Sequence, residues 1–315
     1  MKHKVKLRKK AYSKTILSRR QFCEAGASAI AMALLPAKAL TSIGESASTR
    51  MPGIPTLDEL ETEWLDCSQL AHMPSLHNFH EMAACAPDLI GVNFLPRGQL
   101  YKDSGPRWYI YNTLPLCRMS VDGTTYDSTS CKWFAYQAVR RTRTPDLEIM
   151  TTNRLVMEDS AILWRVKLTN TSATKTIRVS IDTDGVRRDA MGGVQLIARS
   201  QEFAMNAIYQ FFDSPINGTD GARVEWELSL PPEQYREIRF FMKAGIEDDE
   251  TQFAAPISWF ESEWIRAKMV WEDRWNDTFA PGNEFFSGNA PTLFTEDAPI
   301  REIYYRSGLT LMVLL

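Results

Sequence analysis

The stretch from Ile162 to Thr169 has the sequence ILWRVKLT, in which two kinds of side chain alternate. Successive side chains of a β-strand point to opposite faces, so the Ile, Trp, Val and Leu at the even-numbered positions would share one face. The Leu, Arg, Lys and Thr between them would share the other. The stretch from Val224 to Leu230, VEWELSL, alternates in the same way. Both stretches predict strands that apolar neighbours cover on one face.

Further short β-like runs lie on both sides of these two stretches, and turn residues separate them. The runs are Trp108–Tyr111, Ile177–Ile181, Val194–Ile197 and Ile238–Met242, and the probable turns are Asp122-Gly123, Asp184-Gly185 and Asn217-Gly218. Asp-Gly and Asn-Gly pairs favour two-residue hairpins, which join antiparallel strands. The pattern predicts a mainly β fold, a large antiparallel β-sandwich over residues 90–250.

Residues 251–282 predict a helix that follows the sandwich. Pro256 suits the first turn, and Ser258 with Glu261 has the spacing of a capping box. Large aromatic residues recur at helical spacing, namely Phe260, Trp264, Trp271 and Trp275. Such a stripe can be a sugar-stacking face, but packing against neighbouring elements is the favoured interpretation.

The stretch from Trp275 to Leu293 is rich in Pro, Gly, Asn and aromatic residues, which predicts an ordered loop. Thr295 to Pro299 then has the acidic and Pro residues of a helix start. Apolar residues follow at three- and four-residue steps, among them Ile300, Ile303 and Leu311. The apolar end of the chain lacks a capping signal, so we expect this helix to belong to a longer helical region.

The N-terminus has the features of an export signal. Residues 1–39 hold ten basic residues and one acidic residue, and Arg19-Arg20 precedes a short apolar run from Ala25 to Leu35. The arginine pair resembles the signal that the twin-arginine translocase recognises, with cleavage expected after Ala39 and a periplasmic or secreted protein as the product. The alternatives are a general secretory signal and a retained anchor, although the run is short for a stable membrane span.

The rest of the chain carries 26 basic and 38 acidic residues, a net charge of −12. An acidic body repels phosphate backbones, so we expect no nucleic-acid partner. His77 and His80 have a spacing that could face one metal, but no carboxylate or Cys pattern completes a site, and the sequence predicts neither a metal nor a cofactor. Leu57 to Leu70 is expected to form a short helix.

Four cysteines remain after removal of the signal: Cys67, Cys85, Cys117 and Cys131. An even number suits an oxidising compartment, where disulfides persist. Four cysteines allow three connectivities, and the most local one, Cys67–Cys85 with Cys117–Cys131, is mildly preferred.

The order of a β-sandwich, a Trp-rich helix, an aromatic loop and a helix containing Tyr304-Tyr305-Arg306-Ser307 resembles bacterial glycosidases built on a six-hairpin (α/α)6 toroid. This group includes processing α-glucosidases and mannosylglycerate-hydrolase-type enzymes. The resemblance covers residues 90–315 in organisation and residues 275–315 in recognisable motifs. It implies a supersandwich at 90–250, a linker helix at 251–282 and the start of a toroid at 283–315. Residues 40–89, which precede this region, are expected from their composition and spacing to form a linker and a short helix.

The resemblance also implies hydrolysis of oligosaccharides by two carboxylates in the inverting arrangement. In that family both acids belong to the toroid beyond its first helix, so this chain would hold neither of them. Five loop residues are the candidate rim of the sugar site: Phe285, Phe286, Ser287, Gly288 and Asn289. The alternatives are that this loop only docks two domains, and that the protein is a non-catalytic carbohydrate-binding or structural sandwich of the cell envelope.

Overall fold

The computed structural model describes residues 53–72, 75–95, 117–183, 185–190, 193–200, 205–213, 222–246, 254–283, 285–286 and 288–314. All of them belong to one compact unit, Met51–Leu315. The signal arginines Arg19 and Arg20, the strand expected at Trp108–Tyr111 and the turn expected at Asn217-Gly218 lie outside the described residues. Neither helix in the described ranges is both long enough and apolar enough to cross a bilayer.

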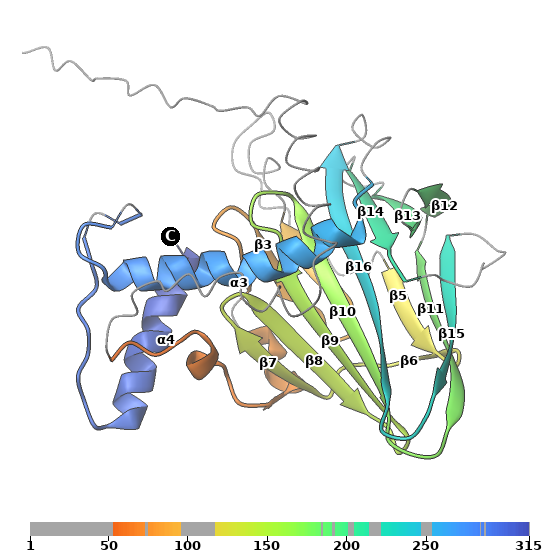
Figure 1. Ribbon diagram of the computed structural model, residues 1–315, viewed down its shortest axis with the longest axis horizontal. Helices are drawn as coiled ribbons and strands as arrows, with labels where there is room; N and C mark the ends of the chain where they lie inside the picture. Colours follow the sequence, from red (N-terminus) through yellow and green to blue (C-terminus); the bar gives the residue numbers. More distant parts are fainter. Residues whose placement is uncertain are drawn as a thin grey trace, which may run out of the picture. The chain divides into compact units, whose positions relative to one another are not determined.

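A nine-stranded antiparallel sheet dominates the fold (Figure 1). Its strands follow the order β1-β7-β8-β9-β10-β16-β14-β13-β12. Their bounds are β1 (Leu65–Asp66), β7 (Ser130–Phe134), β8 (Gln137–Arg143), β9 (Leu147–Leu155), β10 (Ala161–Asn170), β16 (Tyr235–Ile246), β14 (Met205–Phe211), β13 (Gly193–Ser200) and β12 (Gly185–Ala190). The central strand β10 lies between β9 and β16, with Trp164 opposite Asn153 on one side and Phe240 on the other.

Two smaller antiparallel sheets complete the β structure. One has the order β15 (Arg223–Leu230), β11 (Lys175–Thr183), β5 (Cys117–Val121) and β6 (Thr124–Thr125). The other consists of β2 (Leu76–His77), β3 (Met82–Cys85) and β4 (Val92–Leu95). Asp122 and Gly123 join β5 to β6 with φ angles of 50° and 76°, the two positive values that a type I′ hairpin turn requires.

One apolar core joins the three sheets, which confirms the mainly β sandwich. Trp164 and Val166 of the large sheet, Val179 and Trp226 of the four-stranded sheet, and Ala83 of the three-stranded sheet all belong to it. The alternation predicted for β15 is confirmed, since Val224, Trp226 and Leu230 are buried while the glutamates between them face outward. Layers of this kind form because each sheet must cover its apolar face.

The prediction that β10 is covered on one face only is wrong at its N-terminal end. Leu163 is as fully buried as Ile162, although the two side chains point to opposite faces. The helix α3 (Ile257–Phe279) covers the outer face here, and its Phe260 and Trp264 pack with Leu163 and Phe241. Figure 1 shows α3 running across the large sheet.

The aromatic stripe of α3 is a packing stripe, as expected. Six residues of the helix are buried: Phe260, Trp264, Ala267, Trp271, Trp275 and Phe279. The predicted capping box is wrong, because Pro256 is the N-cap and no side chain caps the helix. Glu261 instead forms ion pairs with arginines of the sheet.

The expected C-terminal helix is α4 (Ala298–Leu314). Its start is fixed as predicted, since the Asp297 carboxylate accepts a hydrogen bond from the Ile300 N–H at 3.1 Å. Tyr305, Leu309 and Met312 bury one face of α4 in a second core that contains Trp271 and Trp275 of α3. The faces of α3 and α4 that carry none of these buried residues lie outside the core.

The segment from Leu57 to Leu70 does not form the single helix that was expected. It consists of two 3-10 turns, η1 (Asp58–Leu60) and η2 (Cys67–His72), with the edge strand β1 between them. Leu57 and Leu60 are drawn into the core of the two helices, and Leu65 pairs with Cys131 of β7. These tertiary contacts override the local helical spacing, as they commonly do for weak propensities.

The same N-terminal segment is tied to both helices. The Trp275 indole donates a hydrogen bond to the Pro55 carbonyl at 2.8 Å, and the Arg301 guanidinium donates to the Gly53 carbonyl at 2.9 Å. Arg306 donates to the carbonyl of Glu61. Residues separated by more than 200 positions in the sequence therefore share one polar and apolar interface.

Candidate functional site

An open groove of about 400 Å³ lies on the outer face of the large sheet, beside the N-terminal half of α3. Segments far apart in the sequence line it: the segment before β1, strands β7 to β10, strand β16 and α3. Three aromatic residues face it, Trp64, Phe134 and Trp264. Its charged residues are Glu61, Lys132, Arg165, Lys167 and Glu237. We refer to this site as the outer groove.

Trp64 is the exposed aromatic wall of the outer groove. Its side chain is 37% exposed, which is unusual for a residue that folding normally hides. The Arg141 guanidinium lies 3.7 Å from the centroid of the Trp64 ring system, and the Lys132 ammonium lies 5.5 Å from it. These cation–π contacts fix the plane of the indole. The outer groove therefore presents a large, oriented ring to solvent.

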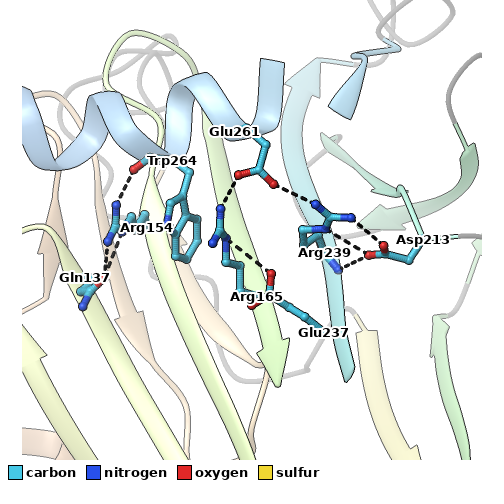
Figure 2. Close-up of polar contacts among 8 residues, drawn as sticks. All are labelled: Gln137, Arg154, Arg165, Asp213, Glu237, Arg239, Glu261 and Trp264. Carbon is cyan, nitrogen blue, oxygen red and sulfur yellow. Dashed lines mark hydrogen bonds and ion pairs between the residues drawn. The ribbon is translucent and has the colours of Figure 1, made fainter. Parts of the chain in front are cut away.

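Trp264 forms the opposite aromatic element and is mostly buried. The guanidinium groups of Arg154 and Arg165 each lie 4.4 Å from the centroid of its ring system. Arg154 also donates to the backbone carbonyl of Trp264, and its Nε and Nη2 donate to the Gln137 amide oxygen at 3.0 and 2.7 Å (Figure 2). Burial lowers the pKa of Arg154 to about 10, which leaves it charged at neutral pH.

A chain of alternating charges fastens α3 to the sheet next to the outer groove. Figure 2 shows Glu261 of α3 between Arg165 of β10 and Arg239 of β16. Glu261 pairs with Arg165, and its second oxygen lies 3.0 Å from Arg239. Arg239 continues to Asp213 at 2.8 Å, and Arg165 Nε lies 3.8 Å from a Glu237 oxygen. The hydrogen bond that Arg239 donates to Asp213 raises the pKa of Arg239, so this cation stays charged.

The two carboxylates of the outer groove differ in their surroundings. Glu61 accepts a hydrogen bond from Lys132 at 3.0 Å, and both side chains face the groove. Burial raises the pKa of Glu237, although Arg165 and Arg239 oppose that effect. Both carboxylates are paired with cations. They can therefore accept hydrogen bonds from a ligand, but they are not free to act as a catalytic acid and base pair.

The outer groove combines features that suit a polar ligand with apolar faces. An indole offers a flat apolar surface, while Gln137, Thr152 and the ion-paired side chains offer donors and acceptors at its edges. Opposite charges lie side by side, so the lining favours no single sign of ligand charge. A neutral molecule with many hydroxyl groups matches this combination better than a phosphate or a lipid does.

The loop that was predicted as the sugar-site rim is held by Asn283. The side-chain oxygen of Asn283 accepts from the N–H groups of Phe285 and Phe286 at 3.1 and 2.7 Å. Its amide nitrogen donates to the carbonyls of Ala280 and Gly288 at 3.1 and 3.0 Å. One side chain thereby closes the loop onto the C-terminal end of α3.

The structure places the described rim candidates in two environments. Phe286 is half-buried and packs against the core of the two helices, whereas Phe285, Gly288 and Asn289 are exposed. Ser287 lies outside the described residues. The Arg274 guanidinium stacks on Phe79 at 3.7 Å and lies 4.9 Å from the Phe285 ring centroid. These contacts explain how the loop is held against α3, and its role at a sugar site stays a prediction.

His77 has a structural environment. Its Nδ1 accepts a hydrogen bond from the Phe79 N–H at 2.7 Å, and its carbonyl accepts one from the Trp271 indole at 3.0 Å. Burial lowers the pKa of His77 to about 4, so the ring is neutral at physiological pH. No group of three or more His, Cys, Asp or Glu within the described ranges is placed to hold a metal ion.

Sequence reasoning did not find the outer groove. The alternation of β10 predicted that Arg165 and Lys167 share a face, but nothing local indicated that Glu237 and Gln137 lie beside them. Trp64 lies in the Leu57–Leu70 segment, for which the sequence predicts a helix that does not form. The available signal was the clustering of exposed charges and aromatic residues on strands, which becomes a site only once the strand order is known.

Comparison with known proteins gives a likeness to solved structures and none to known families. No protein-family model matches the chain, and no curated protein matches it. The chain is similar to a solved structure named "Putative kojibiose phosphorylase from human microbiome", with a TM-score of 0.45 and 11% identity. The match covers 73% of this chain and 39% of the length of that protein.

Proposed function

We propose that this chain is the sandwich portion of an exported glycoside hydrolase that acts on oligosaccharides. A pair of carboxylates would cleave the glycosidic bond, one as general acid and one as the base that activates water, in the inverting arrangement. Both would lie outside this chain, on a helical toroid that begins at α4. The resemblance of residues 275–315 to six-hairpin glycosidases supports this proposal, as does the route implied by the arginine pair at Arg19 and Arg20.

The uncovered face of α4 is the observation that carries the proposal. Ile300, Ile303 and Leu311 are 54%, 67% and 60% exposed, although the opposite face of the same helix is buried against α3. A helix that is apolar on both faces normally lies inside a larger helical assembly. A second layer of helices would bury this patch, which is otherwise a sizeable apolar surface for a soluble protein.

The test compares the full reading frame with residues 40–315 alone. We expect the product of the full reading frame to hydrolyse an oligosaccharide in a chromogenic panel, and residues 40–315 to hydrolyse none. Ile303→Asp should destabilise the full-length protein because it would place a charge inside the helical layer. The same change should leave residues 40–315 as stable as before. Equal effects in both proteins, or turnover by residues 40–315, would refute the proposal.

A second candidate function is carbohydrate binding without catalysis, and the outer groove favours it. Trp64→Ala removes the exposed ring and should weaken retention on an oligosaccharide affinity gel. Ile265→Ala is the matched control, since Ile265 is 57% exposed on α3 and does not line the outer groove. If the product of the full reading frame shows no turnover while Trp64→Ala alone abolishes retention, the binding function is the correct one.

A further inference from the structure

Among the described residues that line the outer groove, Gln137 is the only one with a side-chain amide. It begins β8, and the strand register places it across from Arg154 of β9, because the next pair along the ladder joins Ala138 to Asn153. Residues that lie opposite each other in an antiparallel pair point to the same face. Gln137 and Arg154 therefore share the outer face of the large sheet, where Trp264 of α3 lies beside them (Figure 2).

Arg154 fixes the orientation of the Gln137 amide. The Arg154 Nε and Nη2 both donate to Gln137 Oε1, at 3.0 and 2.7 Å. A guanidinium has only donors, so the amide atom that faces it must be the oxygen. Arg154 is held in turn by Trp264, because its Nη1 donates to the Trp264 carbonyl and its guanidinium lies 4.4 Å from the centroid of the indole. The amide cannot turn over without breaking both bonds to this cation.

The amide nitrogen of Gln137 is the free end of the side chain. No group in the described part of the chain accepts a hydrogen bond from it, and the nitrogen is open to solvent. An amide nitrogen carries two N–H donors and no acceptor. Since the oxygen is occupied, Gln137 offers only donors to the outer groove. Glu61 and Glu237 offer acceptors in the same groove, so the lining provides both halves of the hydrogen bonding that a hydroxyl group needs.

We propose that Gln137 determines the specificity of the outer groove by donating a hydrogen bond from Nε2 to an oxygen of a neutral oligosaccharide. This inference rests on the proposed carbohydrate-binding function of the outer groove. Trp64 supplies the flat apolar surface for a sugar ring, and Gln137 supplies a neutral donor for the polar edge of that ring. A site built to donate rejects a ligand that lacks the matching acceptor, because the donor is then left unpaired.

The change Gln137→Glu separates this binding role from a structural one. A carboxylate has the shape of the amide and gives Arg154 a charged partner, which it lacks among the described residues. The Arg154 fork then holds the carboxylate oxygens, and neither oxygen can donate to a ligand. We expect this variant to be at least as stable as the wild-type protein and to bind its ligand about tenfold more weakly. A purely structural role for Gln137 predicts no loss of binding.

The test measures ligand binding and thermal unfolding of the product of the full reading frame. An array of neutral oligosaccharides identifies the glycan that the wild-type protein binds most tightly, and calorimetric titration gives the dissociation constant of that glycan for each variant. Gln234→Glu is the matched control, because it makes the same charge change at an exposed position that does not line the outer groove. It should leave both the dissociation constant and the unfolding midpoint unchanged.

Unchanged binding by the Gln137→Glu variant would overturn the inference. A lower unfolding midpoint of this variant would overturn it as well, because Arg154 would then not hold the amide oxygen. Two further results separate the role of Gln137 from the binding function itself. If Trp64→Ala abolishes binding while Gln137→Glu does not, the binding function stands and the role of Gln137 is refuted. If the wild-type protein binds no glycan of the array, both are refuted.

Discussion

Replacing Trp164 with Ala should be the most damaging single change in the sandwich. Trp164 is 1% exposed in the middle of β10, its ring stacks on Phe240 with centroids 5.0 Å apart, and its indole donates to the Ile90 carbonyl at 3.0 Å. Core Trp→Ala changes cost about 3–5 kcal/mol. The lost ring pair and the carbonyl left without its donor place this change at the upper end, at about 5 kcal/mol of unfolding free energy.

Urea unfolding measures this cost. With an m-value of roughly 3 kcal/mol/M, the midpoint should fall by about 1.7 M. Lys167→Ala on the opposite face of β10 is the control. Its ammonium lies 4.1 Å from the centroid of the Tyr235 ring, a contact worth about 1 kcal/mol or less. Equal midpoint shifts for the two variants would show that the assignment of inner and outer faces is wrong.

Three further predictions concern the helix, the buried histidine and the signal. Glu261→Ala should lower the free energy of unfolding by about 1–2 kcal/mol, because it leaves Arg165 and Arg239 without their shared partner. The loss should shrink in 1 M NaCl, which screens the ion pairs. Denaturant unfolding of both proteins at two salt concentrations measures this effect. The pKa of His77 is lowered in the folded state, so the unfolded protein binds more protons at this residue than the folded protein does. Stability should therefore be lost as pH falls from about 6.5 to about 4. His77→Gln should flatten that part of a pH–stability curve. Changing Arg19 and Arg20 together to Lys keeps the charge and should still block export, which cell fractionation tests. N-terminal sequencing of the exported wild-type protein should begin at Leu40.

Patterns with a period of two or of 3.6 residues predicted the elements well. The inner faces of β10 and β15, the buried stripe of α3 and the start of α4 all followed from side-chain spacing. The spacing reports which residues share a face, because the backbone geometry fixes it. It says nothing about the element on the other side, which is why the burial of Leu163 under α3 was missed.

The outer groove and the sheet edge at β1 depend on which strands are neighbours. Glu237 reaches Arg165 because β16 lies beside β10, a pairing between residues about 70 positions apart. Leu65 pairs with Cys131 only because a two-residue strand joins the sheet edge. Such pairings are set by the packing of the whole sheet, and a short segment carries no signal for them.

The ties between the N-terminal segment and the two helices have a consequence for how fast the chain can fold. The Pro55 carbonyl accepts from Trp275 and the Gly53 carbonyl accepts from Arg301, so neither carbonyl finds its donor until more than 200 further residues have been synthesised. Contacts of such large sequence separation slow folding, because the chain loses the entropy of closing the loop before the stabilising contact forms. During synthesis the strands can pair early, while the interface of the two helices must assemble last. A ribosome-stalled chain that lacks α4 should therefore hold a protected sheet and an exposed, protease-sensitive N-terminal segment.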